Sequence, residues 1–577
     1  MPMNNVELAQ AFEKIADLLE IKGEVIYVTL AYRRAAESLR TLGQEAETYR
    51  ATQPLISIPG IGKAIAEKIT ELLDTGKLGF LEKLEAEVPV SLLEILEVPD
   101  VGPKKVALFW KQAGITSLSE LEIAAQERQL RSLPGMGEKS EQRILEGIAA
   151  LRRRSHRMTL GVARPIGLRW IEWLRAQPCV QHAEFAGSLR RWRSTIGDLD
   201  LVAACENPSA LMAAFTGHPE VERVLGQGEN KSSIELKSGL KLQLWIQPAA
   251  NFGSLLQYAS GSKEHNVRLR ELALKQGWSL SERGLTSPDG KLVSYPDEES
   301  LYQALGLPWI TPELREDRGE IQAALAGKLP ALLHTSALKA ELHSHTTWSD
   351  GVSSIREMAE AARQRGLKVL AITDHSASLG IAGGLKAEDL LKQRVEIDQV
   401  QKEVGSDILL LQGAEVEIKA DGTLDHPDEV LARLDVVIAS LHVSLRQPRK
   451  EITERLLKVM RNPHVDIIGH PSGRLLPNRE GADLDMDAVL ASAKEHGLAL
   501  EINANPARLD LDEVYARRAA EMGIPLTINT DAHSPIDLDL REYGVSVARR
   551  AWVKPEGVIN TWPVEKITAW LKSRGRK

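Results

Sequence analysis

The fold class that the sequence predicts is multidomain, with α+β and α/β parts. The 577 residues are enough for three or more domains with large cores. Residues 1–150 show helical periodicity, whereas strand-like apolar runs alternate with helical patterns in the C-terminal third. We therefore expect four segments, which are an all-helical domain at 1–150, a mixed domain at 151–318, a linker at 319–338 and a distorted β/α barrel at 339–577.

Composition predicts a soluble globular protein of the cytoplasm. Hydrophobic residues make up 43% and charged residues 26%, without low-complexity runs, which is typical of globular proteins. The N-terminus has the pattern of an amphipathic helix and not of a signal peptide, and no apolar stretch of 18 residues exists, so we expect no membrane association. The two cysteines, Cys179 and Cys205, form no metal-binding motif and fit a reducing compartment. We expect a monomer.

The charge of the chain is uneven. A net charge of −8 argues against a nucleic-acid partner, yet residues 151–194 hold ten arginines against two glutamates. A local basic face matters more for binding DNA than the total charge. The run RRRSHR at 152–157 is either the solvated end of a helix or a surface that contacts phosphates.

Three near-repeats punctuate the helical part: IPGIGKAIAEKI (58–69), VPDVGPKKVALFW (98–110) and LPGMGEKSEQRIL (133–145). A glycine allows a turn with positive φ, and the next helix start offers free N–H groups that can hold a DNA phosphate. One copy could be an ordinary turn between helices, but three copies with a lysine after each glycine favour DNA binding. The candidate residues are Gly60, Gly62, Lys63, Lys68, Gly102, Lys104 with Lys105, Gly135, Gly137 and Lys139.

The stretch FAGSLRRWRSTIGDLDL (185–201) combines a Gly-Ser turn, two arginines and two alternating aspartates. Asp198 and Asp200 face the same way on a strand. Paired carboxylates beside a turn and guanidinium groups suit magnesium and a triphosphate. Alternating acidic residues alone often just face water, so the prediction of a nucleotide site depends on the turn, the arginines and the aspartates occurring together.

The stretch ELHSHTTWSDG (341–351) places two histidines two residues apart, next to an aspartate. Further apolar runs end in VLAITDH, ILLLQGAEVEI, VVIASLH, VDIIGH and LTINTDAH, and helical patterns such as 354–365 and 486–496 lie between them. Strand ends of a parallel barrel meet at one mouth, so these side chains should converge. Nine ligands suit two or three ions, and the lack of cysteine favours zinc, manganese or iron. They are His343, His345, Asp350, His375, Glu415 (with Glu417 nearby), His442, His470, Asp531 and His533.

These motifs carry a resemblance to known families. The ordered set HSH, Asp350, TDH, GAE, SLH, GH and DAH resembles the PHP (polymerase and histidinol phosphatase) domain over about residues 338–570. The GS, RR and GDLD stretch resembles the DNA polymerase beta-like nucleotidyltransferases, and the near-repeats resemble helix-hairpin-helix motifs. Together they make the chain similar to the bacterial family X DNA polymerases (PolX).

The resemblance implies roles for individual residues. Gly187, Ser188 and Arg191 would contact nucleotide phosphates, and Asp198 and Asp200 would hold catalytic Mg²⁺ or Mn²⁺. In YASGSKEHN (258–266), Tyr258 and Asn266 would contact the sugar and base. Lys68 lies where eukaryotic relatives carry a Schiff-base lysine, but lysines at that helix position also simply bind phosphate, which disfavours lyase activity.

The resemblance also implies partners and cofactors. The barrel would be a 3′-to-5′ exonuclease with up to three Mn²⁺ or Zn²⁺ ions, and Arg474 would contact a phosphate or lie on the surface. The partners would be gapped or 3′-ended duplex DNA and deoxynucleoside triphosphates, in base excision repair.

The family pattern breaks at one catalytic position. The third aspartate is expected in GLKLQLWIQP, where Gln243 stands, and Trp245, Ala259 and Ser260 are further departures. A glutamine cannot accept a proton or neutralise a cation, and loss of a positioned base typically slows a reaction by about 10² to 10⁴-fold. We expect an impaired or silent polymerase centre.

The sequence leaves four readings open. The first is a repair enzyme whose working activity is nucleolytic, and the second is a fully bifunctional polymerase and exonuclease. The third is a non-catalytic scaffold that binds DNA ends. The fourth, a small-molecule phosphatase of the histidinol phosphate type, is disfavoured by the three near-repeats and the arginine-rich stretch.

Overall fold

The computed structural model describes residues 3, 5–40, 42, 46–51, 53–58, 60–98, 101–154, 157–378, 382–477 and 479–574. The chain divides into two compact units, Met1–His156 and Arg157–Lys577. None of the helices in these described ranges is long and apolar enough to cross a membrane.

The first unit is entirely helical where it is described, which confirms the predicted class. Its core is built on the long helices α1 and α2, where Leu8, Phe12 and Leu39 are fully buried. The helices are α1 (Asn5–Lys22), α2 (Ile26–Arg40), α3 (Ala46–Arg50), η1 (Leu55–Ser57), α4 (Lys63–Thr75), α5 (Gly79–Glu87), α6 (Leu92–Leu96), α7 (Pro103–Ala113), α8 (Leu118–Gln126), η2 (Leu130–Ser132) and α9 (Glu138–Arg154).

Each near-repeat leads into the start of a helix, namely α4, α7 or α9. Gly60 and Gly135 have φ of +79° and +74°, the conformation that glycine adopts without strain. The glycines directly before α4 and α7, Gly62 and Gly102, are instead extended. Pro103 opens α7 and has no N–H, so this repeat offers one donor fewer. Pro59, Pro99 and Asp100 lie outside the described residues.

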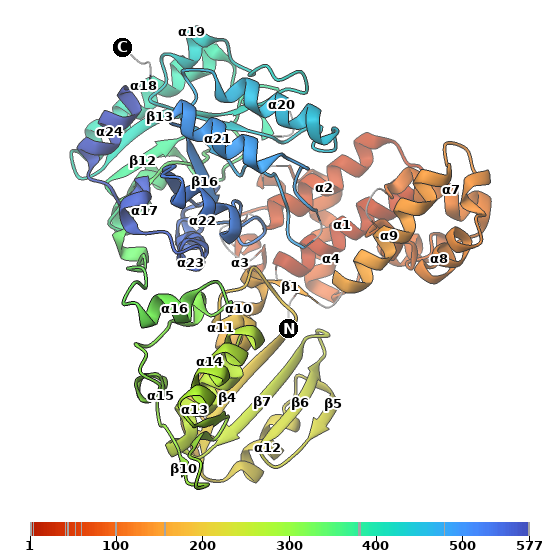
Figure 1. Cartoon of the computed structure of the whole chain (residues 1–577). Coiled ribbons are helices and arrows are strands. Elements are labelled where there is room, and N and C mark those ends of the chain that lie inside the picture. The colour runs from red at the N-terminus through yellow and green to blue at the C-terminus, as the bar shows by residue number, and fades with distance from the viewer. Residues whose placement is uncertain are drawn as a thin grey trace. The chain divides into compact units, whose positions relative to one another are not determined.

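The second unit begins with a five-stranded mixed sheet in the order β2-β4-β7-β6-β5, with strands side by side in Figure 1. Only β4 and β7 are parallel within it. Leu199 and Leu201 of β4 are fully buried, so Asp198 and Asp200 point to the opposite face. The strands are β2 (Val180–Phe185), β4 (Asp198–Cys205), β5 (Val221–Gln227), β6 (Lys231–Leu236) and β7 (Lys241–Gln247).

Helices and short strands complete this part. They are β1 (Met158–Thr159), α10 (Leu160–Arg175), α11 (Gly187–Arg190), β3 (Thr195–Ile196), α12 (Pro208–Thr216), η3 (Ala249–Asn251), α13 (Phe252–Ser260), α14 (Lys263–Lys275), β8 (Ser279–Ser281), β9 (Gly284–Thr286), β10 (Leu292–Val293), α15 (Glu298–Ala304), η4 (Pro312–Leu314), α16 (Glu320–Leu325) and η5 (Thr335–Ala337).

The remainder is a seven-stranded sheet in which all neighbours are parallel and spatial order equals chain order. A parallel bridge between Ser344 and Ala532 joins the first strand to the last, which confirms a nearly closed barrel. The strands are β11 (Ala340–Glu341), β12 (Val369–Ile372), β13 (Leu409–Glu417), β14 (Val436–Ser440), β15 (Ile467–Gly469), β16 (Ala499–Asn503) and β17 (Leu526–Asn529).

Helices follow the strands and cover the barrel (Figure 1). The helical patterns predicted at 354–365 and 486–496 are confirmed by α17 and α21. The helices are α17 (Ile355–Gln364), α18 (Ala387–Val404), α19 (Asp428–Leu431), α20 (Arg449–Met460), α21 (Met486–His496), α22 (Glu513–Glu521), η7 (Pro535–Leu540), α23 (Arg541–Arg550), η8 (Pro555–Gly557), η9 (Ile559–Thr561) and α24 (Val564–Lys572).

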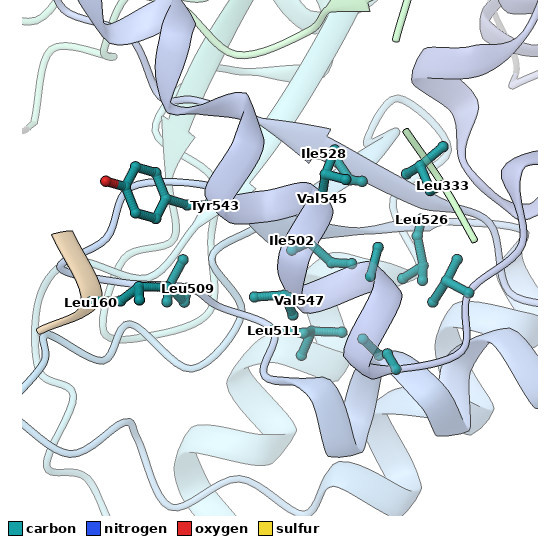
Figure 2. Packing of buried hydrophobic residues seen from close by; sticks show 14 of the residues in the cluster. Leu160, Leu333, Ile502, Leu509, Leu511, Leu526, Ile528, Tyr543, Val545 and Val547 are labelled. Carbon is teal, nitrogen blue, oxygen red and sulfur yellow. The ribbon is translucent and has the colours of Figure 1, made fainter. Parts of the chain in front are cut away.

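Helix α23 packs its apolar side on the last two barrel strands. Figure 2 shows Tyr543, Val545 and Val547 among the buried side chains of β16 and β17. The loop after β16 also meets α10, because a Cβ on Gly161 would lie 2.5 Å from the Cβ of Pro506. The mixed sheet and the barrel therefore share one apolar core.

An ion network crosses the same contact. Glu316 follows η4, and Glu513 opens α22. Arg550 of α23 lies between them, with Nη1 3.1 Å from Glu316 and Nη2 3.0 Å from Glu513. Its side chain is only 2% exposed, and it also donates to the carbonyl of Arg191. The barrel is thereby tied to the turn that carries Arg191.

Replacement of Arg550 by methionine should destabilise the second unit by about 3 kcal/mol, because two largely buried carboxylates lose the most deeply buried of the arginines that neutralise them. Urea unfolding followed by tryptophan fluorescence measures this loss. Arg433→Met, at an exposed position, should change stability by less than about 0.5 kcal/mol. A loss below about 1 kcal/mol for Arg550→Met would show that the network is not a structural tie.

Candidate metal centre and nucleotide pocket

The nine side chains predicted to bind metal come from the carboxyl ends of the barrel strands. The apolar run 338–342 predicts a strand that presents both histidines on one face, but β11 ends at Glu341, so the two histidines lie in the following loop. Glu415 lies within β13, and the other ligand candidates follow β12, β14, β15 and β17. Parallel strands bring their carboxyl ends to one side of a barrel, which is why residues so far apart in sequence meet.

Glu415 lies at the centre of the cluster. Its carboxylate oxygens lie 2.9 Å from both His375 Nδ1 and His470 Nε2. They lie 3.3 Å from His442 Nε2 and 3.5 Å from His343 Nε2. Five imidazoles, with His345 at 3.7 Å, thus surround one buried carboxylate.

The remaining members join the cluster through two aspartates. Asp531 lies 3.0 Å from His345 Nε2. Asp350 lies 3.4 Å from both His375 and His533. Ligand atoms within 4.8 Å of one another form overlapping groups, which are His345, Asp350, His375 and His533; His343, His345, Glu415 and Asp531; and His375, Glu415 and His442.

The donor set fits divalent cations. Nitrogen and oxygen donors without sulfur suit zinc, manganese or iron. Among the described residues, four buried ligand atoms lack a hydrogen-bond partner, which native interiors rarely tolerate unless another group binds them. These atoms are His343 Nε2, His345 Nδ1, Glu415 Oε2 and His470 Nδ1.

Two further glutamates hold the imidazoles from behind. Glu501 of β16 lies 2.8 Å from Nδ1 of His343, and Glu417 lies 2.7 Å from Nδ1 of His442. Each contact leaves the Nε2 atom turned toward Glu415. Such carboxylates fix the orientation of a metal-binding histidine and raise its basicity. Sequence reasoning missed Glu501, although an acid inside the apolar run ALEIN was a usable signal.

Electrostatics confirm that these groups are strongly coupled. Burial raises the pKa of Glu415, but the charges of the neighbouring histidines outweigh burial and hold it well below its usual value. Burial lowers the pKa of His375, but the charges of Glu415 and Asp350 raise it to about 10. Burial, followed by the charges of His533 and His375, lowers the pKa of His345 to about 4. The carboxylates thus need positive charge close by, which protons or cations can supply.

Two ligand candidates have unusual backbone conformations. His470 has φ of +25° and Asp531 has φ of +54°, a region that non-glycine residues seldom adopt. The amide of His470 donates to Glu501 at 2.7 Å, which helps to hold this conformation. Strained backbone that is retained in this way is typical of functional sites.

The residues predicted to bind a nucleotide line one cavity of about 740 Å³ beside the mixed sheet. Its lining includes six basic and four acidic side chains in all, so an anion is attracted there while two aspartates remain to bind a cation. The predicted residues that it brings together are Gly187, Ser188, Arg191, Asp198, Asp200, Tyr258 and Asn266.

Gly187 allows the turn to approach the carboxylates. It has φ of +55°, and a Cβ there would lie 2.0 Å from Oδ2 of Asp200, so no other residue fits. Burial, together with the charge of Asp198, raises the pKa of Asp200 to about 7. A bound cation would favour the charged form of both carboxylates.

Gln243 lies where the third carboxylate was expected. It pairs with Asp200 in the register of the parallel strands β4 and β7, and its Nε2 donates to Oδ2 of Asp198 at 2.8 Å. The amide therefore satisfies an aspartate oxygen that would otherwise be available to a cation. Glu235, the acid nearest to Gln243 along the sequence, lies on β6 and pairs with Arg223.

The two arginines of the turn have different partners. Arg190 is held by Glu298 at 2.8 Å and 2.9 Å, and Arg315 contacts the same buried carboxylate. Arg191 lines the cavity, where its Nε donates to Glu316 at 3.0 Å and its Nη1 donates to the carbonyl of Ser260. A triphosphate that binds Arg191 has to compete with Glu316.

The candidate DNA-binding lysines are open to solvent. Lys63, Lys104 and Lys139 are exposed near the starts of α4, α7 and α9. Lys68 is half-buried, with Nζ 4.9 Å from the ring centre of Phe80 and 3.3 Å from the carbonyl of Ala64. In the run RRRSHR, the side chains of 152–154 and residues 155–156 lie outside the described part, whereas Arg157 donates to Thr195 and lines the cavity.

Models of known families match the chain in separate regions. A helix-hairpin-helix domain matches residues 3–78, and a SAM-like helix-hairpin-helix tandem matches 92–150. The DNA polymerase beta thumb matches 255–316, and the PHP domain matches 341–505.

Curated relatives extend these matches. The DNA polymerase/3'-5' exonuclease PolX of Bacillus subtilis is 37% identical over 575 residues, which cover 99% of this chain and 100% of the relative. A probable phosphatase of Thermoanaerobacter sp. is 34% identical over 254 residues, 41% of this chain and 96% of its own length. A probable phosphatase of Caldanaerobacter subterraneus is 30% identical over 248 residues, 41% of this chain and 92% of its own length.

Glu501→Gln should weaken metal binding by about 10- to 100-fold, because a neutral amide does not raise the basicity of the His343 imidazole as a carboxylate does. Dialysis against graded chelator concentrations, followed by elemental analysis of the protein, measures this affinity. Glu495→Gln, an equal change at an exposed position of α21, should leave it unaltered. Equal metal retention by both variants would contradict a metal centre supported by Glu501.

Proposed function

The chain belongs to the PolX family of DNA polymerases and 3′-5′ exonucleases, and on this basis we propose that its working activity is metal-dependent removal of nucleotides from DNA 3′ ends. The observation that carries this proposal is the convergence of nine ligand candidates, Glu415 among them, with buried ligand atoms still unpaired. The helix-hairpin-helix unit supplies DNA binding through backbone phosphates.

The nine side chains would hold two or three manganese or zinc ions. Ions bound there would supply the charge that stabilises a phosphodiester under attack and that acidifies water. Glu501 and Glu417 keep two imidazoles oriented, and burial of Glu415 and His343 strengthens the electrostatic interactions between them.

The reaction is a hydrolysis. A bond forms between the oxygen of water and phosphorus, and the bond from phosphorus to the 3′ oxygen of the preceding nucleotide breaks. The proton from water ends on that 3′ oxygen, and a nucleoside 5′-monophosphate leaves. Its phosphodiester substrate is anionic, as is suitable for a site rich in arginine and imidazole groups.

The mixed-sheet cavity would bind Mg²⁺ or Mn²⁺ and a deoxynucleoside triphosphate, with slow or absent synthesis. Asp198 and Asp200 remain to bind a cation, and Ser188 and Arg191 face the same cavity. Gln243, however, cannot take the proton of a primer hydroxyl, and it already donates to Asp198.

The second candidate function is a fully bifunctional polymerase and exonuclease. It is favoured by the cavity, which all seven predicted nucleotide-binding and catalytic residues line. Supplying deoxynucleoside triphosphates in the exonuclease assay separates a purely nucleolytic enzyme from a bifunctional one, since only a bifunctional enzyme extends the primer that it also shortens.

A 5′-labelled primer incubated with the protein and Mn²⁺ should yield a ladder of shorter products. Asp531→Asn should reduce this rate by at least about 10²-fold, because it removes one charged ligand from the centre. Asp407→Asn, the same change at a 65%-exposed side chain, should not alter the rate. Undiminished laddering by Asp531→Asn would place the nuclease activity elsewhere or in a contaminant.

Gln243→Asp should increase Mg²⁺-dependent primer extension by about 10² to 10⁴-fold, because it restores a base and a negative charge beside Asp200. The measurement is made in an Asp531→Asn background, so that degradation does not obscure extension. Gln227→Asp, at an exposed position of β5, controls for the added charge. Robust extension by the protein with Gln243 intact would contradict the proposed impairment.

A further inference from the structure

The loop after β16 directs the side chain of Arg508 toward the metal centre. No sequence motif indicated this residue. Arg508 lies five residues beyond the end of this strand, and its Nε lies 3.7 Å from Oδ2 of Asp531. Its side chain is 16% exposed, so it stands at the boundary between the buried cluster and solvent.

The loop is held firmly in this position. Arg474 donates from Nε to the carbonyl of Arg508 at 2.8 Å and from Nη2 to the carbonyl of Leu509. The buried carboxylate of Asp510 accepts hydrogen bonds of 2.9 Å from Ser472 and from the amide of Gly473. Arg474 therefore braces the loop, and it is Arg508 that is free to meet a ligand.

The guanidinium group of Arg508 keeps an open donor. Its Nη1 is buried and has no hydrogen-bond partner within the described part of the chain. A buried N–H group without an acceptor is destabilising, and native interiors rarely keep one without a purpose. Its acceptor is expected to be a group that arrives from outside.

Asp531 does not fill this role. At 3.7 Å it attracts Arg508 but is too far away for a hydrogen bond. Its Oδ2 already accepts from Nδ2 of Asn503 at 3.1 Å, and its Oδ1 lies 3.0 Å from His345. Arg508 thus approaches the ligand cluster at Asp531, and its positive charge is only partly balanced by this carboxylate.

A second arginine, Arg479, lies beside this loop. Burial lowers the pKa of Arg479, and the positive charges of Arg508 and Arg446 lower it further. Arg479 itself donates to the carbonyl of Gly473. An anion is therefore attracted to this side of the centre, where Arg508 offers the unpaired donor.

We propose that Arg508 binds the phosphodiester that the barrel hydrolyses, with Nη1 donating to a non-bridging phosphate oxygen. The inference rests on the proposed nuclease function and names a substrate-binding residue for it. A guanidinium suits this role because its planar donors match phosphate oxygens and its charge persists at any working pH.

The competing role for Arg508 is that of a countercharge that only positions Asp531. The two roles differ in what is lost when the guanidinium is removed. A positioning residue acts through the ligand, so its loss changes metal content. A phosphate-binding residue leaves the metal in place and weakens anion binding.

The test compares Arg508→Met and Arg508→Lys with Arg449→Met, which removes an arginine that is 56% exposed on the same barrel. Metal content of each manganese-loaded full-length protein is measured by elemental analysis. Inorganic phosphate is then titrated calorimetrically into each protein, and KM and kcat are measured on a single-stranded oligonucleotide. Phosphate that binds elsewhere contributes equally to all variants.

Arg508→Met should retain its manganese and bind phosphate about 10- to 100-fold more weakly than Arg449→Met, with a matching loss of kcat/KM. Arg508→Lys should recover part of the loss, because a lysine keeps the positive charge but lacks the planar set of donors of a guanidinium. Loss of manganese, or a phosphate Kd within about twofold of the control, would overturn the proposal. If no protein cleaves DNA, the nuclease function fails, while the phosphate titration still decides the role of Arg508.

Discussion

The barrel is organised around one buried negative charge, the carboxylate of Glu415. Glu415 is 1% exposed, and five imidazoles lie within 3.7 Å of it. Burying charges is costly unless partners neutralise them, and here two more carboxylates, Glu417 and Glu501, stand directly behind the imidazoles. Divalent cations bound at the proposed centre would place positive charge among these groups and give the unpaired ligand atoms a partner.

The nucleotide cavity also brings carboxylates together, but there a neutral side chain stands where a third carboxylate was expected. Two adjacent aspartates repel each other, which contributes to the raised pKa of Asp200. Gln243 removes a third negative charge from this surface and satisfies Asp198 with a neutral donor. Under the proposed function, both features would reduce the negative charge available to bind a catalytic cation. The two centres of one chain thus differ in how strongly their own charges require metal.

The sequence allowed the barrel and its nine converging residues to be predicted because strand periodicity and chain order locate the ends of parallel strands. It did not reveal which polar residues support them. Glu501 sits within an apolar strand whose end offered no motif, and Arg508 matters only because a loop folds back beside Asp531. Likewise, adjacent Arg190 and Arg191 are indistinguishable by type, and only tertiary packing shows that Glu298 holds the former.

Anomalous diffraction from crystals soaked in Mn²⁺ tests the central claim most directly. Two or three strong peaks are expected within coordination distance of Glu415 and its histidines. Absence of any peak there, under conditions in which the protein shortens DNA, would show that the cluster is a proton-balanced core and not the catalytic centre.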